Sequence, residues 1–254
     1  MQQLMNRVAG VLLAIAVSST SVPATGGGLF IEETNPKIDI RIAIDPTASS
    51  HPGLLEILHE DASALAAKQR QLAAEDHTER GGEPSWNPHQ LDAAYEVTFF
   101  NGKIASVVSK RDTYTGGAHG NQDFVTMLLD LEGGRRINPE GLFVDFSPGS
   151  EAFEAIQAYV RDSISFERAS RLGLPEIPPE DLDWILEGTA TPEQLLRFTL
   201  MDYDEAEKVS DILMYFPPYQ VGSYAEGSYM LDVPALVFAD YLAPEFRPLF
   251  DDGQ

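Results

Sequence analysis

Hydrophobic residues alternate with other residues between positions 38 and 44, where isoleucine occupies every second place. A period of two is typical of a strand with one buried face. After Ser50 the spacing becomes helical, and a helix of about 20 residues ending near Ala74 is predicted. Its apolar positions are Leu54, Leu58, Ala62, Leu65 and Leu72. The polar stretch 75–89, which contains two glycines and two prolines, predicts a surface loop.

The next segments predict a meander of about four strands. Residues 95–100 and 103–108 flank Asn101-Gly102, a pair that favours a β-hairpin because both residues tolerate positive φ. A third strand is expected at 124–131, and the Gly133-Gly134 turn leads to a fourth at 135–137. The sheet is therefore expected to be antiparallel.

Helices and strands come in separate runs in the second half of the chain. Ser147 before Pro148 predicts a helix start, and the helix's apolar face would comprise Phe153, Ile156, Val160 and Ile164. Strands are expected at 212–216 and 228–233, with a short final helix at 234–242. This order indicates an α+β fold: an antiparallel sheet meander with flanking helices, in two small subdomains. We place the N-terminal α+β subdomain at 25–110 and the C-terminal one at 111–254.

The N-terminus has the pattern of a secretory signal peptide. Arg7 precedes an apolar run at 8–17 and a small-residue stretch that ends at Ala24. Residues 1–24 are thus predicted to be cleaved off, which makes the protein periplasmic or secreted. A run of about ten apolar residues is short of the roughly 20 that span a bilayer, so no stable span is expected after cleavage. An uncleaved anchor is the alternative.

Charge and composition narrow the classes of partner. Lys and Arg number 17 against 40 for Asp and Glu, which gives a net charge of -23. This charge disfavours nucleic acids and anionic membrane surfaces as partners and favours a cationic partner. The alternative is an acidic surface that serves solubility alone. The oligomeric state stays open.

Chemical motifs are scarce. The chain has no cysteine, and its five histidines include no His-x-x-x-His pair, so no metal site is predicted. Hydrolase elbows and phosphate-binding or dinucleotide-binding loops do not occur either, so no cofactor is predicted.

A glycine-rich segment at 112–122 separates two predicted strands. It contains Tyr114, Thr115, Gly116, Gly117 and His119. Ordinary hairpins need only two to five turn residues, so this segment does more than reverse the chain. It is either a recognition loop, a small active site in which His119 joins Asp112 or Asp123, or a wide β-arch.

The stretch 216–224 is the second unusual segment. Pro217 and Pro218 fix φ and present Tyr219 with little entropy left to lose on binding. The segment is therefore a rigid anchor for a partner, or else Tyr219 and Tyr224 are core aromatics at a strand bend. Whether it lies beside the glycine-rich loop is not decided by the sequence.

These two segments carry a family resemblance. Tyr114-Thr-Gly-Gly-Ala-His119 with the strand after it, and 212–227 ending in Leu231-Asp-Val-Pro234, resemble a bacterial extracytoplasmic domain family of unknown function. Its members include the outer part of the anti-sigma factor RsiV and the N-terminal non-catalytic region of the deacetylase PdaC. The resemblance spans about 29–250. The resemblance implies a binding region alone. An anti-sigma factor of this family would need a cytoplasmic domain before its membrane span, where only six residues precede Arg7, and a deacetylase would need a catalytic domain after the matched region, which is not expected here.

The sequence therefore predicts an exported non-catalytic binding module of the bacterial cell envelope. The resemblance implies a cell-wall-associated partner: a cationic protein such as a lysozyme-like muramidase, or peptidoglycan. The alternative is a small cell-wall hydrolase or deacetylase centred on His119. No catalytic residue is assigned. The predicted contact residues are Tyr114, Thr115, Gly116, Gly117, His119, Pro217 and Tyr219.

Overall fold

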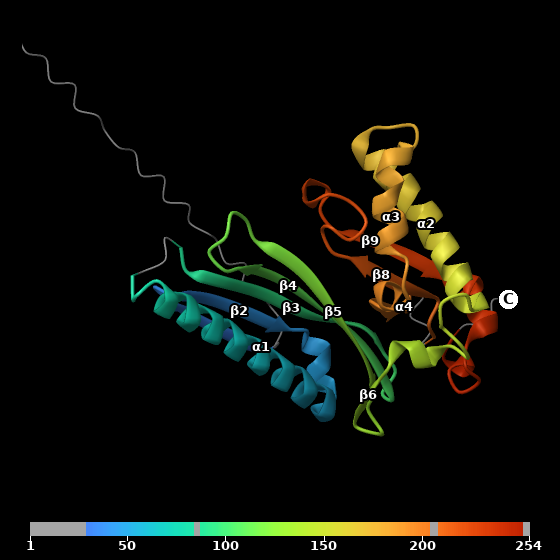
Figure 1. The fold of residues 1–254 in the computed structure, drawn as a ribbon. Helices are drawn as coiled ribbons and strands as arrows, with labels where there is room; N and C mark the ends of the chain where they lie inside the picture. The colour runs from blue at the N-terminus through green and yellow to red at the C-terminus, as the bar shows by residue number, and fades with distance from the viewer. Residues whose placement is uncertain (1–28, 84–86, 204–207, 251–254) are drawn as a thin grey trace, which may run out of the picture.

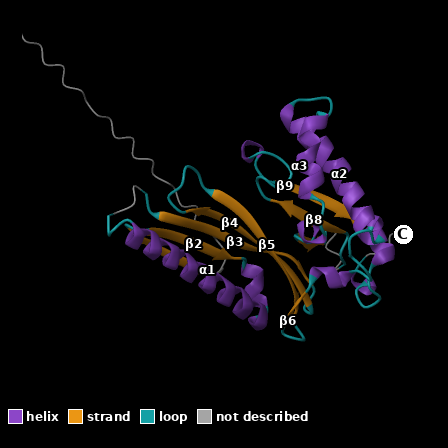
Figure 2. Cartoon of the chain, viewed as in Figure 1, coloured by secondary structure: helices purple, strands orange, loops and turns teal. Residues whose placement is uncertain are grey.

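The computed structural model describes residues 29–83, 87–203 and 208–250, and the predicted signal peptide lies outside them. The fold is α+β, as predicted, with two sheets and helices that pack on them (Figures 1 and 2). A six-stranded sheet has the order β1-β2-β3-β4-β5-β6, and a three-stranded sheet has the order β7-β8-β9. No helix in these three ranges is both long and apolar enough to cross a membrane.

The larger sheet contains the predicted meander. Its strands are β1 (Phe30–Asn35), β2 (Ile38–Ile44), β3 (His89–Phe100), β4 (Ile104–Tyr114), β5 (Asn121–Asp130) and β6 (Arg135–Ile137). From β3 to β6 every neighbouring pair is antiparallel. The sheet is nevertheless mixed, because β2 and β3 run parallel. A long helix connects these two strands, and parallel neighbours need such a crossover.

This crossover helix, α1 (Pro52–Glu79), covers one face of the sheet (Figure 1). The four alternating isoleucines of β2 are buried beneath it, as predicted, at no more than 4% exposure. The helix runs five residues beyond the expected end at Ala74, so part of the predicted loop is helical. Leu72, expected on the apolar face, is exposed.

A carboxylate fixes α1 to the sheet. Asp61 accepts hydrogen bonds from the Tyr95 hydroxyl at 2.7 Å, from Arg111 at 3.0 Å and from Arg136 at 2.8 Å. Burial and the Asp61 hydrogen bond raise the pKa of Tyr95 to about 12. Helix α1 is thereby held to three strands by polar contacts as well as by apolar packing.

The smaller sheet and its helices form the second half of the molecule. The elements are α2 (Glu151–Leu172), α3 (Leu182–Gly188), α4 (Pro192–Leu195), β7 (Phe198–Met201), β8 (Asp211–Phe216) and β9 (Tyr229–Pro234). The predicted apolar face of α2 is buried. The predicted helix start at Ser147 is wrong, because Gly149 adopts φ 85° and Ser150 is the N-cap.

The final helix expected at 234–242 is also absent as one continuous element. Two short 3₁₀ turns, Ala235–Val237 and Ala239–Tyr241, replace it. Phe238 lies between them with φ -134°, which is not helical, and its side chain is fully buried. The turns therefore place an aromatic anchor in the core where a regular helix would continue.

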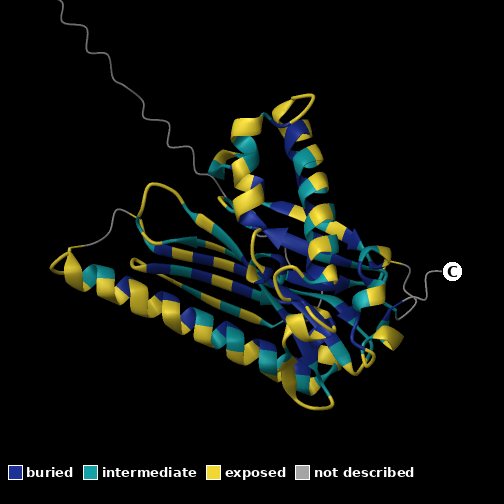
Figure 3. Cartoon of the chain, turned by 45° about the vertical axis from the view of Figure 1, so that its right-hand side comes forward, coloured by how far each residue is buried: buried dark blue, intermediate teal, exposed yellow. Residues whose placement is uncertain are grey.

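The two halves pack against each other. One core lies between α1 and the larger sheet, and another joins Phe99 and Leu128 of that sheet to α2 and the smaller sheet. The backbone N–H of Leu200 in β7 donates to the buried Ser106 hydroxyl in β4 at 2.9 Å. The subdomain boundary placed between residues 110 and 111 falls inside β4. Figure 3 shows the buried bands that run through both sheets.

Candidate functional site

The two unusual segments lie side by side, although about a hundred residues separate them in the chain. The Tyr224 hydroxyl donates to the carbonyl of Gly120 at 2.9 Å. The His119 ring lies on Tyr224 with centroids 4.1 Å apart, and Tyr219 contacts the same tyrosine at 5.4 Å. The three rings form a continuous row, which we call the aromatic row: His119, Tyr224 and Tyr219. The first segment has no buried residue; in the second, Phe216 and Val221 are buried while Tyr219 is exposed.

The ends of β4 and β5 position the first segment. Their ladder closes at Thr113 opposite Asn121, and the loop between them carries the predicted motif. Close packing favours glycine at position 120, since a Cβ there would lie 3.1 Å from the Thr113 carbonyl oxygen. The Nδ1–H of His119 donates to the Gly120 carbonyl at 2.7 Å, which orients the ring toward Tyr224.

A single glutamine side chain fixes the second segment. Gln220 Nε2 donates to the carbonyls of Gly188 at 2.9 Å and Gln194 at 3.1 Å. Its Oε1 accepts from Arg197 at 2.7 Å. Backbone groups of α3 and α4 thus hold the Pro-Pro-Tyr turn in place. The prediction of a rigid turn fits this bonding, and Tyr219 is not a core residue, because it is 51% exposed.

A buried ion pair supports the end of the same segment. Arg168 of α2 donates to both carboxylate oxygens of Glu226, at 2.7 and 3.1 Å. Their side chains are only 3% and 7% exposed. Glu226 also accepts from the Ser223 N–H and the Tyr229 hydroxyl, each at 2.8 Å. Glu226 and Ser223 close a 3₁₀ turn that begins at Tyr224, so the pair fixes the position of the aromatic row.

We expect the Arg168–Glu226 ion pair to make the free energy of unfolding depend on pH in the acidic range. Burial raises the pKa of Glu226, but the hydrogen bonds from Arg168, Ser223 and Tyr229 outweigh it and lower the pKa from 4.5 to about 2. The contribution of ionised Glu226 to the free energy of unfolding is therefore complete above pH 4.5 and is lost as pH falls toward 2. Between pH 6 and pH 3, the free energy of unfolding measured with urea should fall further for the wild-type protein than for Glu226→Gln. Equal losses would contradict this assignment.

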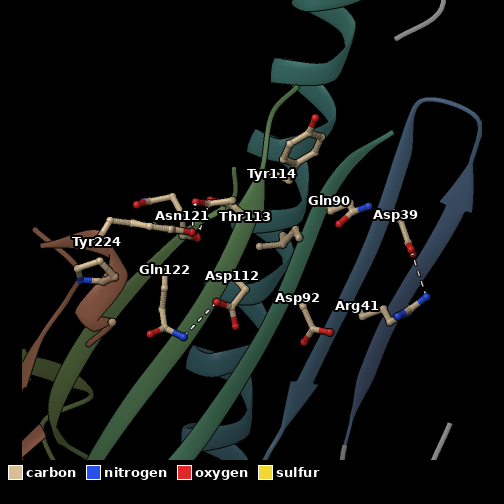
Figure 4. A pocket seen from close by; sticks show the side chains of 14 residues that line it. Asp39, Arg41, Gln90, Asp92, Asp112, Thr113, Tyr114, Asn121, Gln122 and Tyr224 are labelled. Carbon is tan, nitrogen blue, oxygen red and sulfur yellow. Dashed lines mark hydrogen bonds and ion pairs between the residues drawn. The ribbon is translucent and has the colours of Figure 1, made fainter. Parts of the chain in front are cut away.

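Beside the aromatic row, a groove of about 460 Å³ crosses the sheet face opposite α1. A row of four residues in register runs over adjacent strands β2 to β5: Arg41, Asp92, Asp112 and Gln122 (Figure 4). Asp92 and Asp112 lie directly opposite each other. Facing like charges destabilise a sheet, and Arg41, the cation in register with Asp92, forms its ion pair with Asp39 at 3.2 Å.

Gln122 connects the groove to Ser228, the residue directly before β9. Its amide donates to Asp112 at 3.1 Å, and its carbonyl oxygen accepts from the Ser228 hydroxyl. Further polar and aromatic side chains complete the wall. The other lining residues are Asp39, Gln90, Leu91, Thr113, Tyr114, Gly120, Asn121, Pro218, Tyr224 and Gly227. The groove is therefore rich in carboxylates, amides and hydroxyls and has an aromatic end.

The predicted contact residues are distributed around this groove. Tyr114 lines it, and His119 and Tyr219 belong to the aromatic row beside it. The backbone turns at Gly116, where φ is 89°, and at the half-buried Pro217. Thr115 and Gly117 are exposed and do not line the groove.

Sequence reasoning missed most of the groove wall. Asp39 and Arg41 alternate with the buried isoleucines of β2, and Gln90 and Asp92 alternate in the same way on β3. The alternation indicates that these side chains share the outer face. Their alignment in one row depends on strand register, which needs the parallel β2–β3 pairing.

His119 forms no hydrogen bond or ion pair with Asp112 or Asp123, the two carboxylates considered as its catalytic partners. Its Nδ1–H is bonded to Gly120, and Asp112 accepts from Gln122. Within the described ranges, no group of three or more histidine and acidic side chains is arranged to hold a metal ion.

Comparison with known proteins supports the predicted resemblance. Residues 30–122 match the family model of the deacetylase PdaC. The match covers less than half of the chain; it includes the Tyr114–His119 motif and ends before the Pro-Pro-Tyr turn. No curated protein matches.

Two solved structures of DUF3298-family proteins are also similar. The protein from Bacteroides fragilis is 14% identical, with 86% of this chain and 93% of that chain covered and a TM-score of 0.48. The protein from Pseudomonas aeruginosa is 17% identical, with 88% and 94% covered and the same TM-score. The chain thus resembles the PdaC family over residues 30–122, and DUF3298 proteins are its structural neighbours.

Proposed function

We propose that this protein is an exported binding module of the bacterial cell envelope that binds the glycan of peptidoglycan in the sheet-face groove. The observation that carries the proposal is the groove itself, where facing carboxylates and an amide share the wall with Tyr224, the member of the aromatic row that lines the groove. Carboxylates and amides hydrogen-bond sugar hydroxyl and acetamido groups. Aromatic faces pack against the apolar C–H faces of sugar rings. Export rests on the N-terminal sequence pattern.

The position of the groove argues against recognition of an extended peptide by strand addition. That mode requires a free sheet edge, whose unpaired backbone groups bond the peptide. The groove lies over β2 to β5. Strands β2, β3 and β4 each have a neighbour on both sides, whereas β5 pairs with β6 only at Leu128–Asp130 and has β4 as its one strand partner at 121–127 in the described ranges. Binding over β2 to β4 must therefore use side chains, which suits a hydroxyl-rich ligand.

A cationic protein is the second candidate, and charge is the observation that favours it. The chain carries a net charge of -23, and Asp92 and Asp112 face each other without a paired cation among the described residues. A lysozyme-like muramidase would be attracted to such a surface. That complex should dissociate as salt rises from 0.1 M to 1 M, because the Debye length falls from about 10 to 3 Å.

Co-sedimentation of the purified protein with peptidoglycan sacculi tests the first candidate. We expect the wild-type protein to pellet and Asp92→Asn/Asp112→Asn to bind at least about tenfold more weakly, because hydrogen bonds to charged groups contribute about 1.5–3 kcal/mol. The matched control is Asp162→Asn/Asp183→Asn, which removes two exposed charges outside the groove and should bind like the wild-type protein.

The other outcomes separate the remaining possibilities. A salt-sensitive complex with lysozyme, without binding to sacculi, would favour the protein partner. Turnover of peptidoglycan fragments that disappears in His119→Ala would favour the hydrolase or deacetylase. Equal pelleting of the groove variant and the control variant would contradict the groove as the binding site.

A further inference from the structure

The backbone at Tyr219 is unusual. Its φ is 72°, and it is the only residue other than glycine with positive φ in the described ranges. The left-handed region disfavours a bulky side chain, and glycine or asparagine occupies it more readily. Strain of this kind persists where the surroundings impose it, and it is concentrated at functional sites.

Folding does not explain why this position is a tyrosine. The side chain is 51% exposed, and its one ring contact in the described part of the chain is with Tyr224. The turn is closed by other groups: the Gln220 N–H donates to the Pro217 carbonyl at 3.1 Å, and the Gln220 side chain bonds α3 and α4. A glycine at position 219 would keep all of these bonds and would relieve the strain.

Tyr219 extends the aromatic surface beyond the groove. Pro218 and Tyr224 line the end of the groove. Tyr219 follows Pro218 in the sequence, and its ring contacts the ring of Tyr224. Its own side chain is not part of the groove wall. A ligand that fills the groove and continues past Tyr224 would therefore meet the exposed ring next.

We propose that Tyr219 is an outer subsite on which a further sugar ring stacks when a linear glycan extends out of the groove. This inference rests on the proposed function and adds a ligand class to it: extended oligosaccharides are preferred over short ones. The rigid turn increases affinity because the Tyr219 ring, already held in position, loses little entropy when a sugar binds.

A length series of β-1,4-linked N-acetylglucosamine oligomers, from two to six units, tests the subsite by calorimetry. For the wild-type protein, affinity should rise with length. For Tyr219→Gly, short oligomers should bind as before, while the long ones lose about tenfold, as expected for one aromatic stacking contact. The melting temperature should stay the same or rise. Tyr219→Asn, which also tolerates positive φ, should behave in the same way.

Phe166→Ala is the matched control. Phe166 is an exposed aromatic of α2 that belongs to neither the groove nor the aromatic row, so its loss should leave the length dependence unchanged. An unchanged length dependence in Tyr219→Gly would overturn the subsite but leave groove binding intact. An equal loss for short and long oligomers would also overturn it. Absence of binding by the wild-type protein at every length would overturn the proposed glycan function as well.

Discussion

Replacing Arg168 with leucine is expected to lower the free energy of unfolding by about 3–5 kcal/mol, the usual effect of leaving one charge of a buried pair without its partner. Glu226 would stay buried with two of its hydrogen-bond donors missing. The loss of the hydrogen bond from Arg168 to the Asp181 carbonyl adds to the destabilisation. Urea denaturation followed by circular dichroism measures the free energy of unfolding. The turn that carries Tyr224 should loosen, so glycan binding should weaken too.

Lys103→Ala is the comparison. Lys103 pairs with Glu132 at 3.3 Å, but both side chains are about 70% exposed, so the loss should stay below about 1 kcal/mol. A double variant, Arg168→Met with Glu226→Leu, should recover much of the stability, because apolar replacements remove both buried charges. If Arg168→Leu unfolds at the same urea concentration as Lys103→Ala, the pair does not hold the turn.

Gly188→Ala is expected to destabilise the protein by about 3 kcal/mol, the upper part of the range for overpacked cores. A Cβ at this position would lie 1.9 Å from the carbonyl oxygen of Gln220 and 2.8 Å from its carbonyl carbon. Both atoms belong to the backbone, so no side-chain rotation removes the overlap. The helix end and the Pro-Pro-Tyr turn must separate, which shifts Tyr219 as well.

Gly141→Ala serves as the control for this change. A Cβ at Gly141 meets no atom within 4 Å, so a change within about 0.5 kcal/mol is expected, as at most surface positions. Thermal unfolding of the two variants measures the difference. Equal midpoints would mean that the contact between Gly188 and Gln220 is not tight, and the rigid placement of the turn would then be wrong.

The sequence predicted the fold well where a local pattern decides it. The isoleucine alternation of β2 and the Asn101-Gly102 hairpin are confirmed because each depends on neighbouring residues alone. The start of α2 is misplaced because Ser147-Pro148 has a helix-start pattern that the fold does not use. The left-handed Gly149 interrupts the backbone there, and the helix begins after its N-cap Ser150.

The candidate site was less predictable, because tertiary contacts create it. The glycine-rich loop and the Pro-Pro-Tyr turn were recognised separately, but the bond from Tyr224 to Gly120 joins positions that are far apart in the chain. The opposition of Asp92 and Asp112 requires the register between β3 and β4. Neither the contact between the two segments nor the opposition of Asp92 and Asp112 can be predicted from neighbouring residues in the sequence, so the structure was needed to find both.

Chemical-shift mapping tests the central claim, that the groove binds glycan, most directly. Titrating the isotope-labelled protein with a hexamer of N-acetylglucosamine should perturb the amides of Gln90, Asp92, Asp112 and Gln122, with saturation on ligand addition. The Asp92→Asn/Asp112→Asn variant should need a higher ligand concentration for the same shifts. Perturbations confined to other faces, such as α2 around Phe166, or none at all, would contradict the assignment of the groove.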